Sequence, residues 1–115
     1  MEIKWSDLAL SQLDDILDYV EEHFGSRTAI KTLEKINSKV NRLMIFPESG
    51  SPDFGYSTLS ESDSVLIRHL MIDPNVVYYN VDGEVINVMA IAHSRQSPKT
   101  VSTMIKCFLE YMEGC

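Results

Sequence analysis

One stretch of the chain, VVYYNVDGEVINV at residues 76–88, constrains the fold more than any other. Its apolar side chains alternate on both sides of Asp82-Gly83, a dipeptide that is among the strongest short-range signals for a two-residue hairpin turn. Such a turn pairs Val81 with Glu84 and Tyr79 with Ile86. Because side chains alternate between sheet faces, one face of this hairpin is wholly apolar and is expected to carry helices: Val77, Tyr79, Val81, Ile86, Val88, Ala90 and Ala92.

The opposite face of the hairpin is mixed in character. It is predicted to hold Val76, Tyr78, Asn80, Asn87, Met89, Ile91, His93 and, if the strand continues, Arg95. The strands themselves are predicted at residues 65–72, 76–81 and 84–93, the first joining through Asp73-Pro74-Asn75. If Ile72 pairs with Val76, Arg68 lies on the mixed face. A shift of one residue would place His69 there instead, because it moves every side chain to the other face.

Apolar residues at spacings of three and four predict two amphipathic helices in the first half of the chain. The two stripes are Ala9, Leu13, Ile16, Val20 and Phe24, then Ala29, Ile30, Leu33, Ile36, Val40, Leu43 and Met44. Ser6 is the expected N-cap of the first helix, Gly25 ends it, and Ser26 is expected to cap the second. Pro47 stops the second helix. Because the break is so short, the helices should form an antiparallel hairpin.

The remaining elements complete a single domain. A short strand at residues 2–5 precedes the helices, a long loop at residues 48–64 follows them, and Pro98 opens a last helix at about residues 98–113. The chain has 115 residues, of which 44% are apolar, enough for one core. The sequence therefore predicts one α+β domain over residues 1–115, with a helical hairpin packed on an antiparallel sheet in the order β-α-α-β-β-β-α.

The net charge of −7 argues against unspecific affinity for nucleic acid. Its distribution is uneven: the first helix carries acidic side chains, and the second carries the basic row Arg27, Lys31, Lys35, Lys39 and Arg42. Two interpretations stay open. The helices have ordinary solvated faces, or the basic row is a docking strip for an acidic partner.

Other classes of protein find no support in the residues. We see no leading apolar stretch and no apolar run of membrane-spanning length, and we expect a cytoplasmic protein that does not contact the membrane. Cys107 and Cys115 have no metal-ligand spacing and read as free thiols. Neither a nucleotide-binding glycine loop nor a metal cluster is present, so no metal and no cofactor is expected.

Arg68, His93 and Arg95 are the only grouping with catalytic possibilities. A histidine can act as a general acid or base near neutral pH, and an arginine can stabilise a phosphorane-like transition state. The structural alternative is that these residues mark strand ends that emerge from the core. On the residues alone that alternative is favoured, because clusters without a motif seldom prove catalytic.

Two segments of the chain resemble the RelE/ParE superfamily of type II toxin–antitoxin toxins, which includes plasmid stabilization proteins. The first holds Asp7-Leu8, Ile16-x-x-Tyr19 and Leu43-x-x-Phe46-Pro47-x-x-Gly50. The second holds an arginine that opens the sheet, then Tyr-Tyr-x-Val-Asp-Gly, and a strand that ends Ile-x-His-x-Arg. The match covers residues 3–96, and the fold that it implies agrees with the fold argued above.

The superfamily has two branches that differ in chemistry. RelE-like toxins cut messenger RNA on the ribosome with basic residues on the sheet and its preceding loop, whereas ParE-like toxins poison DNA gyrase without known catalysis of their own. Here the loop between Pro47 and Ser64 offers no lysine or arginine, and Val76 or Asn75 stands where RelE-like toxins place an arginine. The resemblance therefore favours a ParE-like gyrase inhibitor that acts by binding and is neutralised by a cognate antitoxin.

Two alternatives remain. In a RelE-like endoribonuclease acting on ribosome-bound mRNA, the catalytic residues would be Arg68, His93, Arg95 and Tyr79. The net charge also motivates a decayed, non-toxic homologue that only binds its antitoxin. Under the favoured interpretation the partner-binding residues are expected to be Arg27, Lys31, Lys35, Lys39, Arg42, Tyr78, Asn80 and Arg95. The oligomeric state stays open between a homodimer and a toxin–antitoxin heterotetramer.

Overall fold

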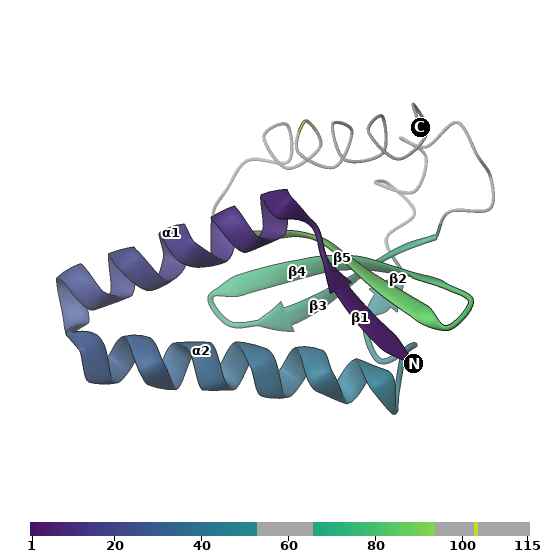
Figure 1. Ribbon diagram of the computed structural model, residues 1–115, viewed down its shortest axis with the longest axis horizontal. Helices are drawn as coiled ribbons and strands as arrows, with labels where there is room; N and C mark the ends of the chain where they lie inside the picture. The colour runs from purple at the N-terminus through teal and green to yellow at the C-terminus, as the bar shows by residue number, and fades with distance from the viewer. Residues whose placement is uncertain (53–65, 94–102, 104–115) are drawn as a thin grey trace.

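Two helices lie across one face of a sheet in the structure, a computed structural model that describes residues 1–52, 66–93 and 103 (Figure 1). The elements in chain order are β1 (Glu2–Trp5), α1 (Asp7–Phe24), α2 (Ser26–Asn41), the 3-10 helix η1 (Arg42–Met44), β2 (Ser51–Pro52), β3 (Ile67–Ile72), β4 (Asn75–Asp82) and β5 (Val85–His93). The predicted α+β fold with an N-terminal helical hairpin is confirmed. The helix predicted at residues 98–113 lies outside the described part of the chain, apart from Thr103.

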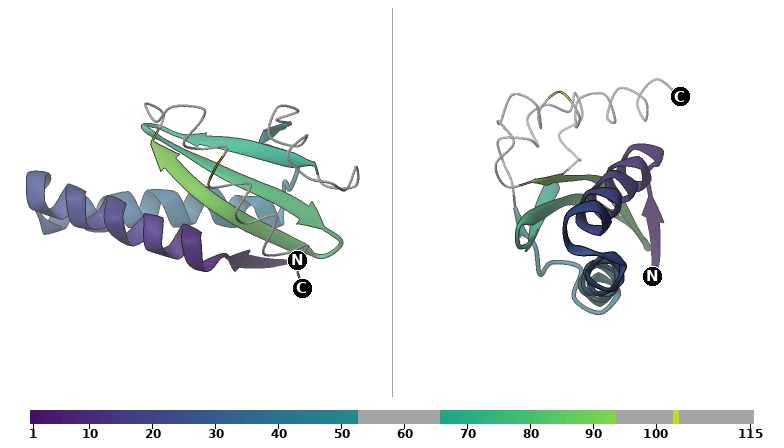
Figure 2. Two further views of the ribbon diagram at one scale, coloured as in Figure 1. Left: turned by 90° about the horizontal axis from the view of Figure 1, so that it is seen from above. Right: turned by 90° about the vertical axis from the view of Figure 1, so that its left-hand side faces the viewer.

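The sheet has five strands in the order β1-β5-β4-β3-β2. It is mixed, whereas an antiparallel sheet was predicted, because β1 pairs parallel to β5. Parallel neighbours require a long connection, and here the helical hairpin and the rest of the sheet lie between the two strands. The short strand β2 falls at the start of the predicted long loop and pairs antiparallel with β3. Seen end-on in the right-hand view of Figure 2, α1 and α2 lie side by side on one face of the sheet.

Ser6 is the N-cap of α1, as predicted, and it also fastens this helix to the sheet. Its hydroxyl oxygen accepts a hydrogen bond of 2.9 Å from the Ala9 N–H and donates one of 2.8 Å to the Met89 carbonyl. Gly25 ends α1 with φ of 95°, and its N–H bonds to the Glu21 carbonyl. The predicted cap at Ser26 is wrong: Gly25 occupies the N-cap position of α2, no side chain caps the helix there, and Ser26 is already helical.

The β4–β5 hairpin turns one residue later than predicted, at Gly83-Glu84 instead of Asp82-Gly83. Asp82 pairs with Val85, and Val81 pairs with Ile86 instead of Glu84. Gly83 has φ of 59°, whereas no non-glycine residue in the described part of the chain, Glu84 included, has a positive φ. This combination fits a type II′ turn with glycine at its first central position. Each residue of β4 near the turn thus pairs with a residue two positions further along β5 than predicted. Because the shift is an even number of residues, the faces of the residues next to the turn are still as predicted.

A β-bulge at Met89 changes the faces beyond that point. Tyr79 pairs with Val88 but Tyr78 pairs with Ala90, so Met89 is the extra residue on β5. A bulge of this kind exchanges the two faces of one strand relative to its partner. Ile91 therefore packs in the core under the helices, and Ala90 and Ala92 pack on the second face, the reverse of the prediction.

On β3 the alternative register applies. Ile72 pairs with Asn75, and His69 pairs with Tyr78, so His69 lies on the second face. Arg68 pairs with Tyr79 and lies on the face that carries the helices.

The core divides between the two faces of the sheet. Under the helices, one cluster joins Leu13, Ile36 and Val77 with their neighbours, and a second joins Leu43, Tyr79 and Ile86. A third cluster on the second face includes Val76, Tyr78, Met89, Ala90 and Ala92, with Leu8 packed against it. Three residues of the predicted helix stripes are exceptions, because they are exposed: Phe24, Ile30 and Met44.

Candidate functional site

Tyr79 fixes the turn that follows the helices to the sheet. Its side chain is fully buried, and its phenolic oxygen accepts a hydrogen bond of 2.8 Å from the Gly50 N–H. The same hydroxyl donates a bond of 2.9 Å to the Pro47 carbonyl. The phenol thus both accepts and donates a hydrogen bond, and both partners are backbone groups of one short segment. Tyr79, predicted as catalytic under the ribonuclease alternative, is a structural residue in this geometry.

Arg68 holds the same segment from the neighbouring strand. Its guanidinium donates to the Gly50 carbonyl at 2.9 Å and reaches the Glu48 carbonyl at 3.4 Å. Gly50 lies so close that a Cβ placed there would be 2.5 Å from the Tyr79 hydroxyl oxygen and 2.9 Å from the His69 carbonyl. We name this arrangement of Arg68, Tyr79 and the Pro47–Gly50 backbone the tyrosine clamp.

The tyrosine clamp changes the acidity of its phenol. Burial raises the pKa of Tyr79 above its ordinary value of 10.0, while the hydrogen bond from Gly50 and the positive charge of Arg68 act in the opposite direction. The desolvation of a phenolate in the core exceeds these two effects. Tyr79 is therefore a neutral hydrogen-bonding group at physiological pH.

Replacing Tyr79 with phenylalanine is expected to lower the free energy of unfolding by about 2 kcal/mol at neutral pH, because two backbone groups lose their partner. It is also expected to flatten the alkaline decline in stability. With the pKa raised in the folded state, the unfolded chain releases the phenolic proton first, so the wild-type protein loses stability as the pH rises past 10.0. Urea unfolding across this range measures both effects. Tyr19→Phe, at a side chain that is 58% exposed, is the control, and an unchanged alkaline slope in Tyr79→Phe would contradict the argument.

Of the three residues grouped as catalytic candidates, Arg68 and His93 are described by the structure, and they are not brought together. His93 is opposite Asn75, four residues along β4 from Tyr79, the partner of Arg68. At about 3.3 Å per residue that is ~13 Å along the strands, with β4 lying between the other two. The bulge at Met89 also turns His93 to the helix-carrying side, where it was not expected. Arg95 lies outside the described residues.

His93 instead lies at the edge of a groove of about 700 Å³, which we call the hairpin groove. Figure 1 shows why the groove exists: the tip of the helical hairpin extends past the β3–β4 turn, so part of its inner face has no strand beneath it. The walls are lined from α1, α2, the β3–β4 turn and the end of β5. The apolar and aromatic lining residues are Ile16, Tyr19, Val20, Phe24, Ile36, Ile72 and Ile91.

Two polar contacts set the shape of the hairpin groove. The Gln12 side-chain oxygen accepts a bond of 2.9 Å from the Ile91 N–H, at a part of β5 beyond its pairing with β1. The Lys35 ammonium group donates a bond of 2.9 Å to the Asp73 carbonyl and so joins α2 to the β3–β4 turn. Each helix is thereby fixed to one end of the sheet, and the groove between them is preformed.

The hairpin groove was not found from the sequence. Phe24 extends the buried stripe of α1 by spacing, yet it is 66% exposed, and Tyr19 is 58% exposed. The signal was the presence of two aromatic side chains at the end of a stripe. Only the position of the sheet edge decides whether such side chains are covered.

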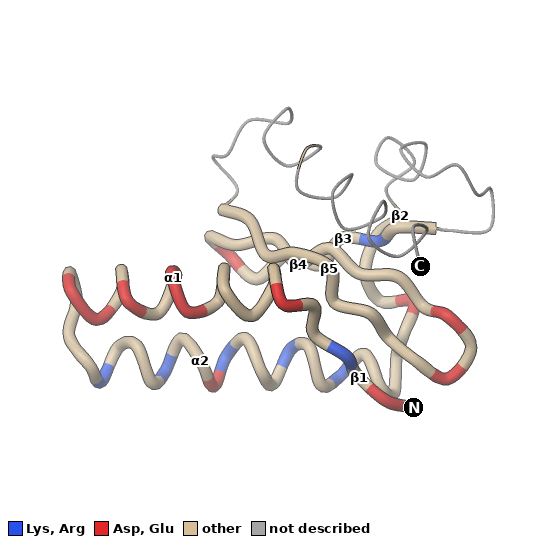
Figure 3. Tube along the Cα trace, turned by 45° about the horizontal axis from the view of Figure 1, so that its top comes forward, with Lys and Arg blue, Asp and Glu red and all other residues tan. Residues whose placement is uncertain are grey.

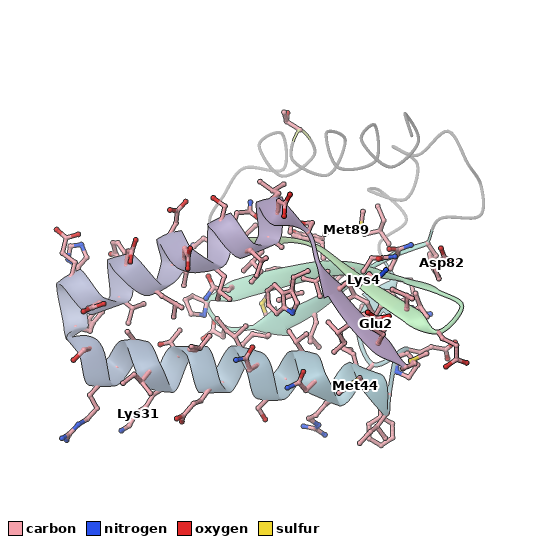
Figure 4. The ribbon with its side chains drawn as sticks, in the orientation of Figure 1. Glu2, Lys4, Lys31, Met44, Asp82 and Met89 are labelled. Carbon is pink, nitrogen blue, oxygen red and sulfur yellow. The ribbon has the colours of Figure 1, made fainter. Side chains whose placement is uncertain are left out.

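The predicted basic row follows α2, and each of its members is exposed: Arg27, Lys31, Lys35, Lys39 and Arg42. Figure 3 shows basic residues along α2 and acidic residues along α1. Figure 4 shows Lys31 pointing away from the sheet. The basic row is thus available to a partner along the outside of the domain.

The other predicted partner-binding residues behave differently. Tyr78 and Asn80 are buried, at 8% and 6% exposure, so they belong to the interior of the sheet. A further exposed apolar group, Met44, Ile45 and Phe46, lies at the end of α2 opposite the hairpin tip (Figure 4). The tyrosine clamp immediately follows this group and fixes the segment that presents it.

Neither a membrane span nor a metal site is visible among residues 1–52, 66–93 and 103. No helix in that part of the chain is long and apolar enough to cross a membrane. In the same residues, no three histidine, cysteine, aspartate or glutamate side chains are placed to hold a metal ion.

The fold and the sequence are similar to those of known toxins. A structure from the chromosomal ParDE toxin–antitoxin system of P. aeruginosa superimposes with a TM-score of 0.61 and 26% sequence identity, covering 81% of this chain and 95% of that one. No curated protein matches the chain. Residues 3–98 match the family model described as the ParE toxin of the type II toxin–antitoxin system parDE. Because that match spans most of the 115 residues, the chain belongs to the ParE toxin family.

Proposed function

We propose that this ParE-family toxin inhibits DNA gyrase by binding it, and that a cognate antitoxin neutralises the toxin by docking in the hairpin groove. The observation that supports binding instead of catalysis is that the polar residues of the sheet already have structural contacts or lie far apart. Arg68 and Tyr79 are hydrogen-bonded to the backbone of one turn, and His93 lies at the other end of the sheet on the helix side. The choice of gyrase as the target is supported by the family.

The chemistry of an RNA-cutting site supports the same choice. Cleavage needs a base and a cation within hydrogen-bond reach of one phosphate. Arg68 and His93 are separated by ~13 Å along the strands and by a third strand across the sheet. In addition, the phenol of Tyr79 already binds two backbone groups. The positions of Arg68, His93 and Tyr79 therefore favour a toxin that acts by binding its target over one that cleaves RNA.

The hairpin groove has the properties of a site for a protein segment. It is open, it is lined mainly by apolar side chains, and two exposed aromatic residues stand at its rim. Aromatic side chains in a partly buried setting are frequent anchors of protein interfaces. An antitoxin with an apolar segment would cover Tyr19 and Phe24 and remove them from water, which favours association.

The test is controlled expression of the chain in bacteria with and without the protein encoded by the neighbouring reading frame. We expect growth arrest, a loss of plasmid supercoiling and a DNA-damage response, all reversed by co-expression of the neighbour. Purified chain should also inhibit the supercoiling reaction of purified gyrase. His93→Ala should retain toxicity, because the groove residue is not catalytic in this proposal. Growth arrest with intact supercoiling and with mRNA cut at ribosome-phased positions would overturn it.

A further inference from the structure

The two helical walls of the hairpin groove carry opposite charges. Asp15 of α1 lines the groove, and Asp18 and Glu22 are within one or two turns of it on the exposed surface of the same helix. The rest of α1 contains further acidic residues but no lysine or arginine. The rim of the groove on α1 is therefore acidic.

The rim on α2 is basic. Lys35 lines the groove, and Lys31 and Arg27 precede it at intervals of four residues, which places the three side chains in a row on one helix face. Lys35 donates to a backbone carbonyl, a neutral group, so this contact does not pair it with an acidic side chain. Figure 3 shows the contrast between the two helices along their length.

The two rims do not neutralise each other across the groove. Within the described residues, the ion pair present joins the Met1 amino group to Glu84, at 3.7 Å, and neither helix contributes to it. The rim charges of α1 and α2 are thus available to a third body. A single-sign ligand such as a nucleic acid would be attracted by one rim and repelled by the other.

We infer that the hairpin groove is specific for an amphipathic protein segment whose apolar stripe has basic residues on one flank and acidic residues on the other. The basic flank faces Asp15 on α1, and the acidic flank faces Lys35 on α2. This arrangement fixes the direction of the segment, because reversing the segment would place like charges together at both rims. The inference rests on the proposed function, in which the segment belongs to the antitoxin, and it adds the chemistry by which this toxin recognises that segment.

Three synthetic peptides test the inference directly against the full-length purified chain. Each is helical, about 20 residues long, and has the same leucine stripe. One peptide has arginine on one flank and glutamate on the other, one has arginine on both flanks, and one has glutamate on both. Fluorescence anisotropy of the labelled peptides measures their affinities. At low salt the mixed peptide is expected to bind about tenfold more tightly than the other two, and this preference is expected to fade at high salt.

Single charge reversals should change the order of affinities in a defined way. Lys35→Glu places an acidic side chain at the groove on both walls, since Asp15 and Lys35 are the charged helix residues that line it, and it should make the all-arginine peptide the tightest. Asp15→Lys places a basic side chain at the groove on both walls and should favour the all-glutamate peptide. Arg42→Glu and Asp14→Lys reverse exposed charges that do not line the groove, and they should leave the mixed peptide preferred. Circular dichroism of each variant checks that the fold is retained.

Equal affinities for the three peptides, or an order of affinities that Lys35→Glu and Asp15→Lys do not change, would overturn the inference. So would a dimer of the chain in sedimentation that Lys35→Glu dissociates, since a second copy would then occupy the groove. These readouts do not use toxicity. A chain that is toxic and neutralised but shows no peptide preference loses only this inference, whereas a chain with the preference but without any effect on supercoiling loses only gyrase as its target.

Discussion

Replacing Gly50 with alanine is expected to lower the free energy of unfolding by about 3 kcal/mol, the largest effect of an added methyl group among the described glycines. The added carbon would lie 2.5 Å from the Tyr79 hydroxyl oxygen, 2.6 Å from its ring and 2.9 Å from the His69 carbonyl. Two of these neighbours belong to a fully buried side chain and the third to a sheet backbone. The Tyr79 side chain cannot move without breaking the bonds of the tyrosine clamp, and the His69 carbonyl is held in β3 between two strands. Urea unfolding measures the loss.

Gly83→Ala is the matched control, because it adds the same methyl group at a turn with nothing within 4 Å. Its cost is expected to be about 1 kcal/mol, from the positive φ of 59° that a side chain disfavours. The comparison separates lack of space from lack of backbone freedom, since Gly50 has no positive φ. If the two substitutions cost the same, the close packing against Tyr79 does not limit residue 50.

The tyrosine clamp also fixes the position of exposed apolar residues that precede it in the chain. Met44, Ile45 and Phe46 are exposed apolar residues on the segment that the clamp ends, and the Ser49 N–H bonds to the Phe46 carbonyl in the same turn. A free turn with three apolar residues would tend to collapse onto the nearest surface. Because Pro47 and Gly50 are bonded to Tyr79 in the sheet, this turn has a defined position.

The sequence was sufficient for both described α-helices and for the order of β3, β4 and β5, because these depend on local signals, although it did not give the register of the pairs. Ser6 and Gly25 mark the ends of α1 by capping chemistry, and the alternation around Gly83 marks the hairpin. The bulge at Met89 has no such signal, since Val88, Met89 and Ala90 are all apolar and would suit either face. The carbonyl of Met89 receives its hydrogen bond from Ser6, 83 residues away in sequence. Because the bulge was not predicted, Ile91, Ala92 and His93 were assigned to the wrong faces of the sheet.

The candidate site was harder to predict for a related reason. Arg68 and Tyr79 are residue types that suit catalysis, and their spacing cannot show that both are bonded to the backbone of residues 47–50. The hairpin groove depends on where the sheet stops beneath the helices, which is a tertiary property. Residue type indicates which chemistry is available, and only the contacts show whether that chemistry is already used within the fold.

Phe24→Asp is expected to weaken binding of the antitoxin by about 100-fold while the protein stays folded. Phe24 is 66% exposed, so its loss removes little from the core. In the complex, however, the proposed segment covers the ring, and burial of such a side chain contributes roughly 2 kcal/mol, or about 30-fold. An aspartate buried in the same place adds the cost of an unpaired carboxylate. Isothermal titration with the protein from the neighbouring reading frame measures the change.

Ile30→Asp provides the control for Phe24→Asp. Ile30 is also an exposed apolar residue of the helical hairpin, at 58% exposure, but it does not line the groove. The same change of charge and hydrophobicity should therefore leave antitoxin affinity within about twofold of the wild-type value. In cells, the Phe24→Asp toxin should remain toxic when the antitoxin is co-expressed, and the Ile30→Asp toxin should be neutralised. If both variants are neutralised equally well, the antitoxin docks elsewhere on the toxin. The next residues to replace are then Met44, Ile45 and Phe46, because they form another group of exposed apolar side chains.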